Sequence, residues 1–342
     1  MTLGPLLFRA DASVAIGTGH VMRCLALAQA WQDAGGTAVF AVAELPPATE
    51  QRLLADGLFV ARIDVAAGSS ADADATAALA QKHSASWLIV DGDRFSPEFV
   101  KRAKASSRRL LLIDDFARRD SSSADLILNP NMGAGEAPYR NAGSVAPLLL
   151  GESYVMLRRE FVAWRGQRSY PDKATNILVT LGGSDPENLT PRITRALTRL
   201  PGYHVTAVTG PGNPNRLEDD LAPNLRVVFN PENLCELMAG ADIAVIAAGG
   251  TLWELLHMGC ATLSYARNSV QSGIVESVAA RGAVLNLGFM AGFQPSALND
   301  AVEDLAQSEA RREQMSIAGR RLIDGKGARR VVEKLLQLGG TS

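Results

Sequence analysis

One histidine stands where an imidazole could do chemistry, at the junction between a short apolar run and a helical pattern. The stretch is IGTGH, residues 16–20, in which Gly17 and Gly19 precede His20. The dipole of a helix disfavours a positive charge at its N-terminus. We therefore expect a lowered pKa for His20 and a neutral imidazole that takes a proton from water near neutral pH. A histidine satisfied by nearby backbone is the alternative.

Two glycine pairs in the second half of the sequence also follow apolar runs and precede helical patterns. Paired glycines let a phosphate approach the backbone, and a helix N-terminus favours an anion. We expect Asp185 to cap the first of these helices, because a carboxylate facing a phosphate would repel it. Glu254, one turn into the second helix, is placed to accept both hydroxyls of a ribose. Plain tight turns are the alternative. The residues expected near a diphosphate are Gly183, Ser184, Gly250 and Thr251.

The opening turn does not fit the dinucleotide-binding fingerprint. Met22 stands where the pattern needs its third glycine, and no acidic residue ends the next apolar run. The sequence therefore disfavours NAD, and we expect no cofactor.

Short apolar runs alternate with longer helical patterns along the whole chain, which predicts an α/β fold with parallel sheets. We expect two Rossmann-like domains with the ligand in a cleft between them, beyond the carboxyl ends of the strands. The predicted strands are 6–10, 37–43, 58–64, 87–93, 109–115, 126–130, 176–183, 204–210, 225–230, 242–250, 261–266 and 283–288.

A polar segment with Gly and Pro, residues 164–175, has the composition of an interdomain linker and predicts one here. It separates an N-terminal domain, 1–163, that carries the histidine turn from a C-terminal, nucleotide-binding domain, 174–324. The last segment, 325–342, predicts an amphipathic helix that could return to cover the first domain.

Composition excludes several classes of partner. The net charge of −2 and the pI near 6.1 give no basic field, so nucleic acid is not an expected partner. No long apolar run or basic leader supports export or a membrane span.

Cys24, Cys235 and Cys260 lack paired spacing and predict buried, reduced thiols of a cytosolic protein. The four histidines are scattered, so no metal site is expected. The oligomeric state is not predicted.

Other polar and aromatic residues have plainer interpretations. Asp114 and Asp115 follow the run LLLI and predict either an acid pair or a turn. His257 lies near the end of an apolar helix and is expected to be structural, and Trp87 and Trp253 are expected in the core.

Several motifs together resemble a known family. They are FRADASVAIGTGHVMRCLALAQAW, LLLIDDFARR, ADLILNPN, LLLGESYVMLRREF, ILVTLGGSDPENLT and AAGGTLWELLHMG, in this order along about 300 residues. The sequence is similar to the UDP-2,4-diacetamido-2,4,6-trideoxy-β-L-altropyranose hydrolase family of pseudaminic acid biosynthesis, a group that also holds spore-coat proteins and glycosyltransferases. The resemblance implies the two-domain glycosyltransferase-B fold, as in the GlcNAc transferase of peptidoglycan synthesis.

The resemblance also implies a reaction. Water would displace UDP at the anomeric carbon with inversion and without a metal, and the active-site histidine of the family falls on His20. A UDP-sugar glycosyltransferase with the same fold, or a non-catalytic binding subunit, is the alternative. The positions implied for substrate or nucleotide binding are Asp11, Gly17, Gly19, Arg23, Gly183, Ser184, Gly250, Thr251, Glu254 and Asn268.

Two positions depart from the family pattern. Asp93 stands where the family usually has a tyrosine, and Ser269 replaces a glutamine that usually follows the asparagine at 268. Gln271 is close enough in sequence to reach back toward that place. Both changes leave the exact sugar open.

Overall fold

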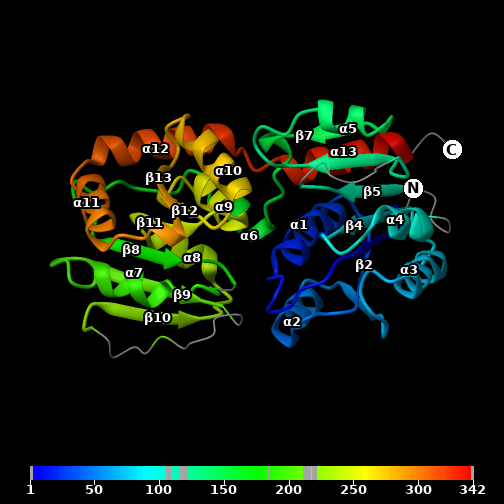
Figure 1. Ribbon diagram of the computed structural model, residues 1–342, viewed down its shortest axis with the longest axis horizontal. Helices are drawn as coiled ribbons and strands as arrows, with labels where there is room; N and C mark the ends of the chain where they lie inside the picture. Colours follow the sequence, from blue (N-terminus) through cyan, green and yellow to red (C-terminus); the bar gives the residue numbers. More distant parts are fainter. Residues whose placement is uncertain are drawn as a thin grey trace. The chain divides into compact units, whose positions relative to one another are not determined.

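The computed structural model describes residues 3–104, 109–115, 117, 122–183, 185–210, 217 and 222–339. The chain divides into two compact units, each an α/β domain around a parallel sheet (Figure 1). Unit 1 contains Met1–Arg159 and Gly325–Ser342, and unit 2 contains Glu160–Asp324. The predicted class of two parallel α/β domains is confirmed.

Unit 1 holds a sheet of seven parallel strands in the order β3-β2-β1-β4-β5-β6-β7. Its central strands are buried along their whole length, which explains their continuous apolar sequences. The strands are β1 (Leu6–Arg9), β2 (Ala38–Val42), β3 (Phe59–Arg62), β4 (Trp87–Asp91), β5 (Leu110–Ile113), β6 (Leu126–Asn129) and β7 (Leu148–Leu150).

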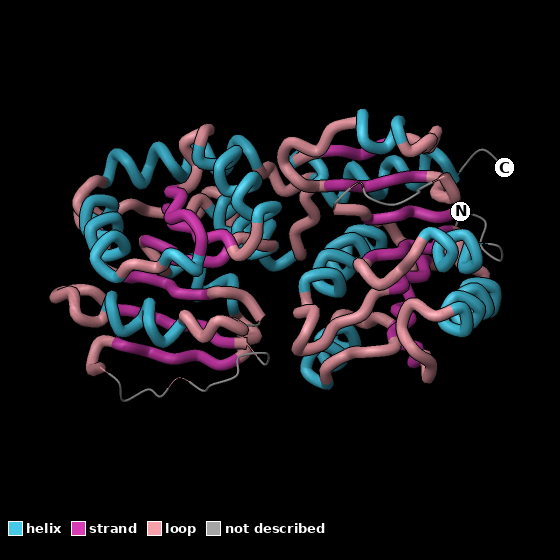
Figure 2. Tube along the Cα trace, viewed as in Figure 1, coloured by secondary structure: helices cyan, strands magenta, loops and turns pink. Residues whose placement is uncertain are grey.

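Helices pack on both faces of this sheet and build two apolar cores (Figure 2). One core contains α1 and the last helix, α13, and the other contains α3 and α4. The helices are α1 (Gly19–Asp33), α2 (Pro47–Ala55), α3 (Ser70–Lys82), α4 (Pro97–Lys104), α5 (Ala137–Asn141) and α13 (Gly327–Gly339), with a 3-10 turn η1 (Glu152–Tyr154). Helix α6 (Arg159–Val162) begins at Arg159 of unit 1, and its other residues belong to unit 2.

The end of the chain is part of unit 1. Val331, Val332 and Leu335 of α13 are buried in the core that contains α1. The helix begins in tight contact with the chain after η1, because a Cβ on Gly327 would lie 2.1 Å from the carbonyl oxygen of Val155. Only a glycine fits this approach.

Unit 2 holds six parallel strands in the order β10-β9-β8-β11-β12-β13, and one apolar core on this sheet contains α7 and α11. The strands are β8 (Asn176–Thr180), β9 (His204–Thr209), β10 (Leu225–Phe229), β11 (Ile243–Ala247), β12 (Ala261–Ala266) and β13 (Leu285–Phe289). The helices are α7 (Thr190–Leu197), α8 (Leu234–Gly240), α9 (Gly250–Met258), α10 (Ser269–Ala279), α11 (Pro295–Ala306) and α12 (Glu309–Leu322), with a 3-10 turn η3 (Met290–Gly292).

The expected linker, 164–175, is instead a fixed part of unit 2. Arg165 donates to the carbonyl oxygen of Ile323 at 2.9 Å, and Arg168 donates to that of Met238 at 2.7 Å. The division in the chain lies earlier, within α6. The polar composition suggested an exposed linker, but these arginine side chains bind backbone carbonyl groups within unit 2.

His257 is fully buried in α9, and its Nδ1 lies 3.0 Å from the carbonyl oxygen of Ile323. Burial lowers its pKa, so it is a neutral donor to backbone. The structural interpretation of His257 is therefore confirmed, as is the core position of Trp87 and Trp253. Cys24 and Cys260 are buried, but Cys235 is only half-buried, contrary to expectation.

Candidate functional site

His20 lies in the first turn of α1, close to the carboxyl end of β4. The loop after β1 folds back on itself through paired backbone hydrogen bonds between Ser13 and Gly17, and Gly17 has a φ of +73° that suits glycine. This loop leads directly into α1. Since β1 and β4 are neighbours in the sheet, the start of α1 meets Asp91, the last residue of β4. The Nδ1 atom of His20 lies 2.8 Å from Oδ1 of Asp91.

Asp91 is fully buried and surrounded by hydrogen-bond donors. Arg23, one turn after His20, donates from Nη2 to Oδ1 at 2.5 Å and from Nε to Oδ2 at 2.6 Å. The thiol of Cys24 donates to Oδ2 at 3.5 Å. Burial alone would raise the pKa of Asp91, but Arg23 and His20 hold it far below its ordinary value. Asp91 is therefore a permanent anion.

The protonation of His20 differs from the sequence-based expectation. Burial lowers the pKa of His20, but the charge of Asp91 and its hydrogen bond outweigh that effect, so the pKa is raised. The prediction of a lowered pKa is wrong because an ion pair at 2.8 Å acts more strongly than the helix dipole.

The ring nitrogens of His20 have different surroundings. Nδ1 lies 2.8 Å from Asp91 and 3.2 Å from Nη2 of Arg23. A carboxylate only accepts hydrogen bonds, so the shorter contact assigns the proton of the neutral ring to Nδ1. Among the described residues Nε2 has no hydrogen-bond partner, and 20% of the side chain is exposed. In the neutral ring Nε2 therefore offers its lone pair to a molecule from solvent.

Arg23 joins Asp91 to a second carboxylate. Its Nη1 lies 2.8 Å from both carboxylate oxygens of Asp115, which follows β5, the next strand beyond β4. Asn131, after β6, donates from Nδ2 to the same carboxylate at 3.0 Å. Asp114 is buried, and its Oδ1 accepts from the backbone N–H of Ala117. The two neighbouring carboxylates thus have different partners, and the contact of Asp114 agrees with the turn interpretation.

Asp11 is buried at the end of β1 and holds backbone. Its Oδ1 accepts from Arg9 at 2.7 Å and from the backbone N–H groups of Ala43 and Glu44 at 2.7 and 3.1 Å. Arg9 is itself paired with Asp72. The structure therefore gives Asp11 a role in fixing the loop after β2. Gly19, the first residue of α1, is exposed.

In unit 2 the expected diphosphate turns lie at neighbouring strand ends, because β8, β11 and β12 are adjacent in the sheet. Gly182 has a φ of +94°, and the next residue is tightly held, since a Cβ on Gly210 would lie 2.6 Å from the Cα of Gly183. Ser184 lies outside the described residues.

Helix α7 does not follow the Gly182-Gly183 turn directly, as the sequence suggested. It begins at Thr190, and the carboxylate of Asp185 accepts from the backbone N–H groups of Leu189 and Thr190 at 3.1 and 2.7 Å. Asp185 therefore binds N–H groups at the start of α7, as predicted, although the N-cap residue itself is Leu189. The consequence is a correction: these N–H groups are already bound and are not open to a phosphate.

The turn after β11 has the expected form. Helix α9 begins at Gly250, no side chain caps it within the described part of the chain, and both Gly249 and Gly250 are exposed. Thr251 and Glu254 are half-buried in its first turns. This N-terminus is the better candidate for an anion in unit 2.

The turn after β12 brings a residue that the sequence analysis missed. Arg267 donates to the carbonyl oxygen of Leu181 at 2.7 Å, which places its guanidinium beside the Gly182-Gly183 turn, and its Nε lies 3.7 Å from the carboxylate of Glu187. Asn268 is exposed and caps α10 by accepting from the backbone N–H of Gln271. The side chain of Gln271 reaches back to the backbone N–H of Arg267. Only the sheet order reveals that Arg267 lies beside Leu181.

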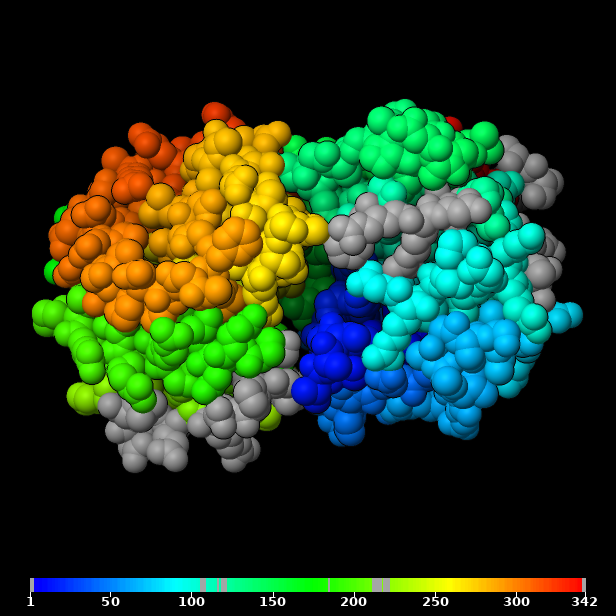
Figure 3. Space-filling model, viewed as in Figure 1, coloured from blue at the N-terminus to red at the C-terminus, as the bar shows by residue number. Residues whose placement is uncertain are grey.

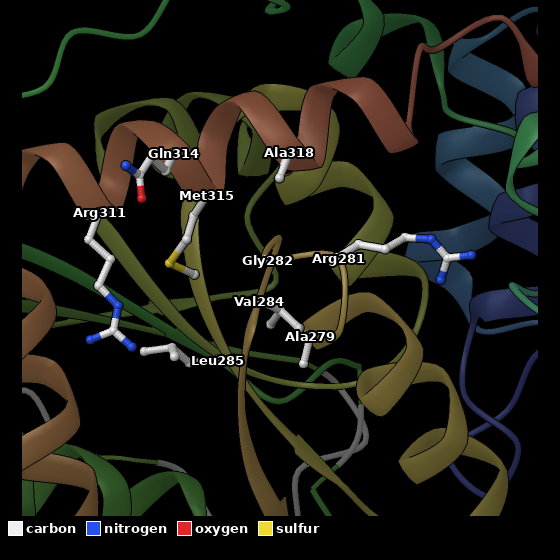
Figure 4. Close-up of a pocket in the computed structure, with 9 residues that line it drawn as sticks. All are labelled: Ala279, Arg281, Gly282, Val284, Leu285, Arg311, Gln314, Met315 and Ala318. Atoms are coloured by element: carbon white, nitrogen blue, oxygen red, sulfur yellow. The ribbon is translucent and has the colours of Figure 1, made fainter.

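A separate cavity of about 430 Å³ lies elsewhere in unit 2 (Figure 4). It is bounded by α12, part of the outer surface of that unit (Figure 3), and by the chain between α10 and β13. Arg311 and Met315 extend from α12 toward Leu285, the first residue of β13. The glycine turns follow the carboxyl ends of strands, so this cavity does not include them. Its lining residues are Ala279, Arg281, Gly282, Val284, Leu285, Arg311, Gln314, Met315 and Ala318.

Two curated proteins are similar to this chain over most of its length. The spore coat polysaccharide biosynthesis protein SpsG of Bacillus subtilis is 26% identical over 249 residues, 70% of this chain and 73% of the relative. The UDP-2,4-diacetamido-2,4,6-trideoxy-beta-L-altropyranose hydrolase of Campylobacter jejuni is 26% identical over 273 residues, 77% of this chain and 92% of the relative. The resemblance inferred from the motifs is thereby confirmed.

No family model matches the chain. Among solved structures, MurG of Acinetobacter baumannii superimposes with a TM-score of 0.65 at 16% identity, covering 98% of this chain and all of that one. Among the described residues no helix is both long and apolar enough to cross a membrane. The chain thus has the two-domain glycosyltransferase-B fold and resembles a UDP-sugar hydrolase and a spore-coat polysaccharide protein.

Proposed function

We propose that this protein is a UDP-sugar hydrolase in which His20 is the general base. The observation that carries the proposal is the His20 and Asp91 pair, with Nδ1 held at 2.8 Å, no partner for Nε2 among the described residues, and 20% of the side chain exposed. A base fixed in one tautomer and partly exposed suits the activation of a water molecule. The similarity to the Campylobacter jejuni hydrolase supports the same reaction class.

In this proposal, unit 2 binds the nucleotide. Gly249 and Gly250 at the open start of α9 would face the phosphates, together with Gly183 and the charge of Arg267. Glu254 would accept the ribose hydroxyls. Binding of the diphosphate by N–H groups and a guanidinium also stabilises it as a leaving group.

The chemistry then needs one base. The oxygen of water forms a bond to the anomeric carbon while the bond from that carbon to the phosphate oxygen breaks, and the electron pair leaves with UDP. Nε2 of His20 takes the proton of the attacking water. Asp91 keeps the ring in the required tautomer and stabilises the imidazolium that forms. We propose a UDP-linked diacetamido-trideoxy sugar as the substrate, with a pseudaminic-acid-type pathway as the setting.

Product analysis tests the reaction. The full chain is incubated with UDP-2,4-diacetamido-2,4,6-trideoxy-β-L-altropyranose, with and without alcohol acceptors, and UDP and sugar products are identified by mass. The proposal expects UDP and free sugar in equal amounts without any acceptor. Release of UDP only when an acceptor is present, with a glycosylated product, would assign the protein to the glycosyltransferases instead.

A further inference from the structure

The pair formed by His20 and Asp91 contains a feature that should weaken it. A carboxylate raises the basicity of a neighbouring imidazole because it stabilises the imidazolium. Here, however, the same carboxylate also binds Arg23 through two hydrogen bonds, at 2.5 and 2.6 Å. Arg23 therefore cancels the charge of Asp91, and its own positive charge opposes the protonation of His20.

Asp115 reverses that cancellation. Both of its oxygens lie 2.8 Å from Nη1 of Arg23, whereas Asp91 accepts from Nε and Nη2. Two carboxylates and one guanidinium leave one negative charge around a neutral His20, and uptake of a proton by His20 makes the group neutral. Without Asp115, the cluster of His20, Asp91 and Arg23 would be neutral before His20 takes up a proton and positive afterwards. Creating a net charge in a partly buried site costs more free energy than removing one.

We propose that Asp115 is a positioning residue for the reaction, which neutralises Arg23 and so allows Asp91 to support His20 as a base. Among the described residues, the charged groups that face His20 are Asp91 from β4, Arg23 from α1 and Asp115 after β5. The thiol of Cys24 faces Asp91, and burial raises its pKa, so it adds no charge.

The position of Asp115 is well determined by its neighbours. Asn131 donates to Oδ1 at 3.0 Å, so the carboxylate is held between β5 and β6 while 18% of its side chain remains exposed. An asparagine at 115 has nearly the same shape and keeps one oxygen that can accept from Arg23 and Asn131, but it loses the charge and one acceptor. This makes Asp115→Asn a test of charge rather than of shape.

The primary test is an NMR titration of the His20 ring in the full chain, with its signal assigned by its absence from the His20→Asn spectrum. Asp115→Asn should lower the titration midpoint of His20, whereas Asp115→Glu should keep it near that of the wild type. The matched control is Asp74→Asn, which removes a carboxylate from an exposed ion pair with Arg102 in the same unit. It should leave the midpoint unchanged.

A double substitution separates charge balance from any structural effect. Arg23→Gln alone should raise the midpoint of His20, and Arg23→Gln with Asp115→Asn should return it toward the wild-type value. An unchanged midpoint in Asp115→Asn, or no return in the double variant, overturns the proposal. If Asp115→Asn does not fold, the direction of the shift in Arg23→Gln decides, because a fall would contradict the charge balance.

The inference rests on the proposed role of His20, but its test is independent of turnover. The titration needs no substrate, so a protein that fails to hydrolyse UDP-sugars can still show the predicted shifts. Where turnover is observed, Asp115→Asn should move the acid limb of kcat/KM to lower pH and reduce the plateau by roughly three- to tenfold, since a weaker base transfers the proton less readily. A normal plateau and limb would contradict the link to the reaction.

Discussion

Replacing Asp91 by asparagine should damage the reaction more than its single-atom change suggests. Every group around the carboxylate donates: His20 Nδ1 and Arg23 Nη2 to Oδ1, and Arg23 Nε to Oδ2. An asparagine has only one accepting oxygen. In either orientation its NH2 group therefore faces a donor, either Nε of Arg23 or the pair formed by Nδ1 of His20 and Nη2 of Arg23. An amide N–H directed at Nδ1 would also force the proton onto Nε2, the nitrogen that must accept it.

The size of the effect follows from these contacts. We expect kcat to fall by about 10²–10⁴-fold, the range for loss of a correctly oriented base. The free energy of unfolding should fall by about 1–3 kcal/mol, because a buried donor is left without its acceptor. Since Asp91 raises the pKa of His20, the wild-type rate should rise through a pKa above 6.5, and this acid limb should move to lower pH in Asp91→Asn.

The assay is steady-state release of UDP between about pH 5 and 9, a range that brackets the ordinary histidine pKa of about 6.5. Thermal unfolding is measured on the same samples. Asp74→Asn, in an exposed ion pair, is the control and should match the wild type in rate and stability. A near wild-type rate in folded Asp91→Asn, or an acid limb that moves to higher pH, would refute the assigned role of Asp91.

Three other substitutions have distinct expected outcomes. His20→Asn should reduce kcat by about 10²–10⁴-fold while leaving the affinity for UDP, measured by calorimetry, unchanged; weaker UDP binding would show that His20 contacts the nucleotide. Gly210→Ala should weaken UDP binding without moving the His20 titration, because the added Cβ would displace Gly183; unchanged affinity would remove that turn from the site. Leu335→Ala, in the core under α13, should lower the free energy of unfolding by about 2–5 kcal/mol in denaturant titrations, and a negligible change would mean that α13 adds little to unit 1.

The fold was largely predictable from the sequence because parallel strands buried on both faces are continuous apolar runs. All twelve predicted strands are present, and no strand end differs from its prediction by more than three residues. The structure also contains β7, a strand that was not predicted because its three residues are too few for a periodic pattern. The segment 164–175 was misassigned because an arginine bound to backbone carbonyl groups reads like an exposed linker arginine.

The candidate site was only partly predictable. His20 stood out because glycines and a helix start surround it, but its partner Asp91 lies 71 residues later and is linked to it only by the pairing of β1 with β4. Sequence spacing does not show which strands are neighbours. The effect of Asp91 on His20 was therefore not foreseen, and the predicted direction of the pKa shift was wrong. Arg267 was missed for the same reason, since its contact with Leu181 depends on the order of three strands.

Transfer of oxygen from isotopically labelled water tests hydrolysis at the anomeric carbon most directly. The full chain is incubated with the UDP-linked diacetamido-trideoxy sugar in water enriched in oxygen-18, and both products are analysed by mass. If His20 activates water for attack on carbon, the label appears in the free sugar and UDP contains none. Label in UDP would place the attack at phosphorus and contradict the proposed mechanism.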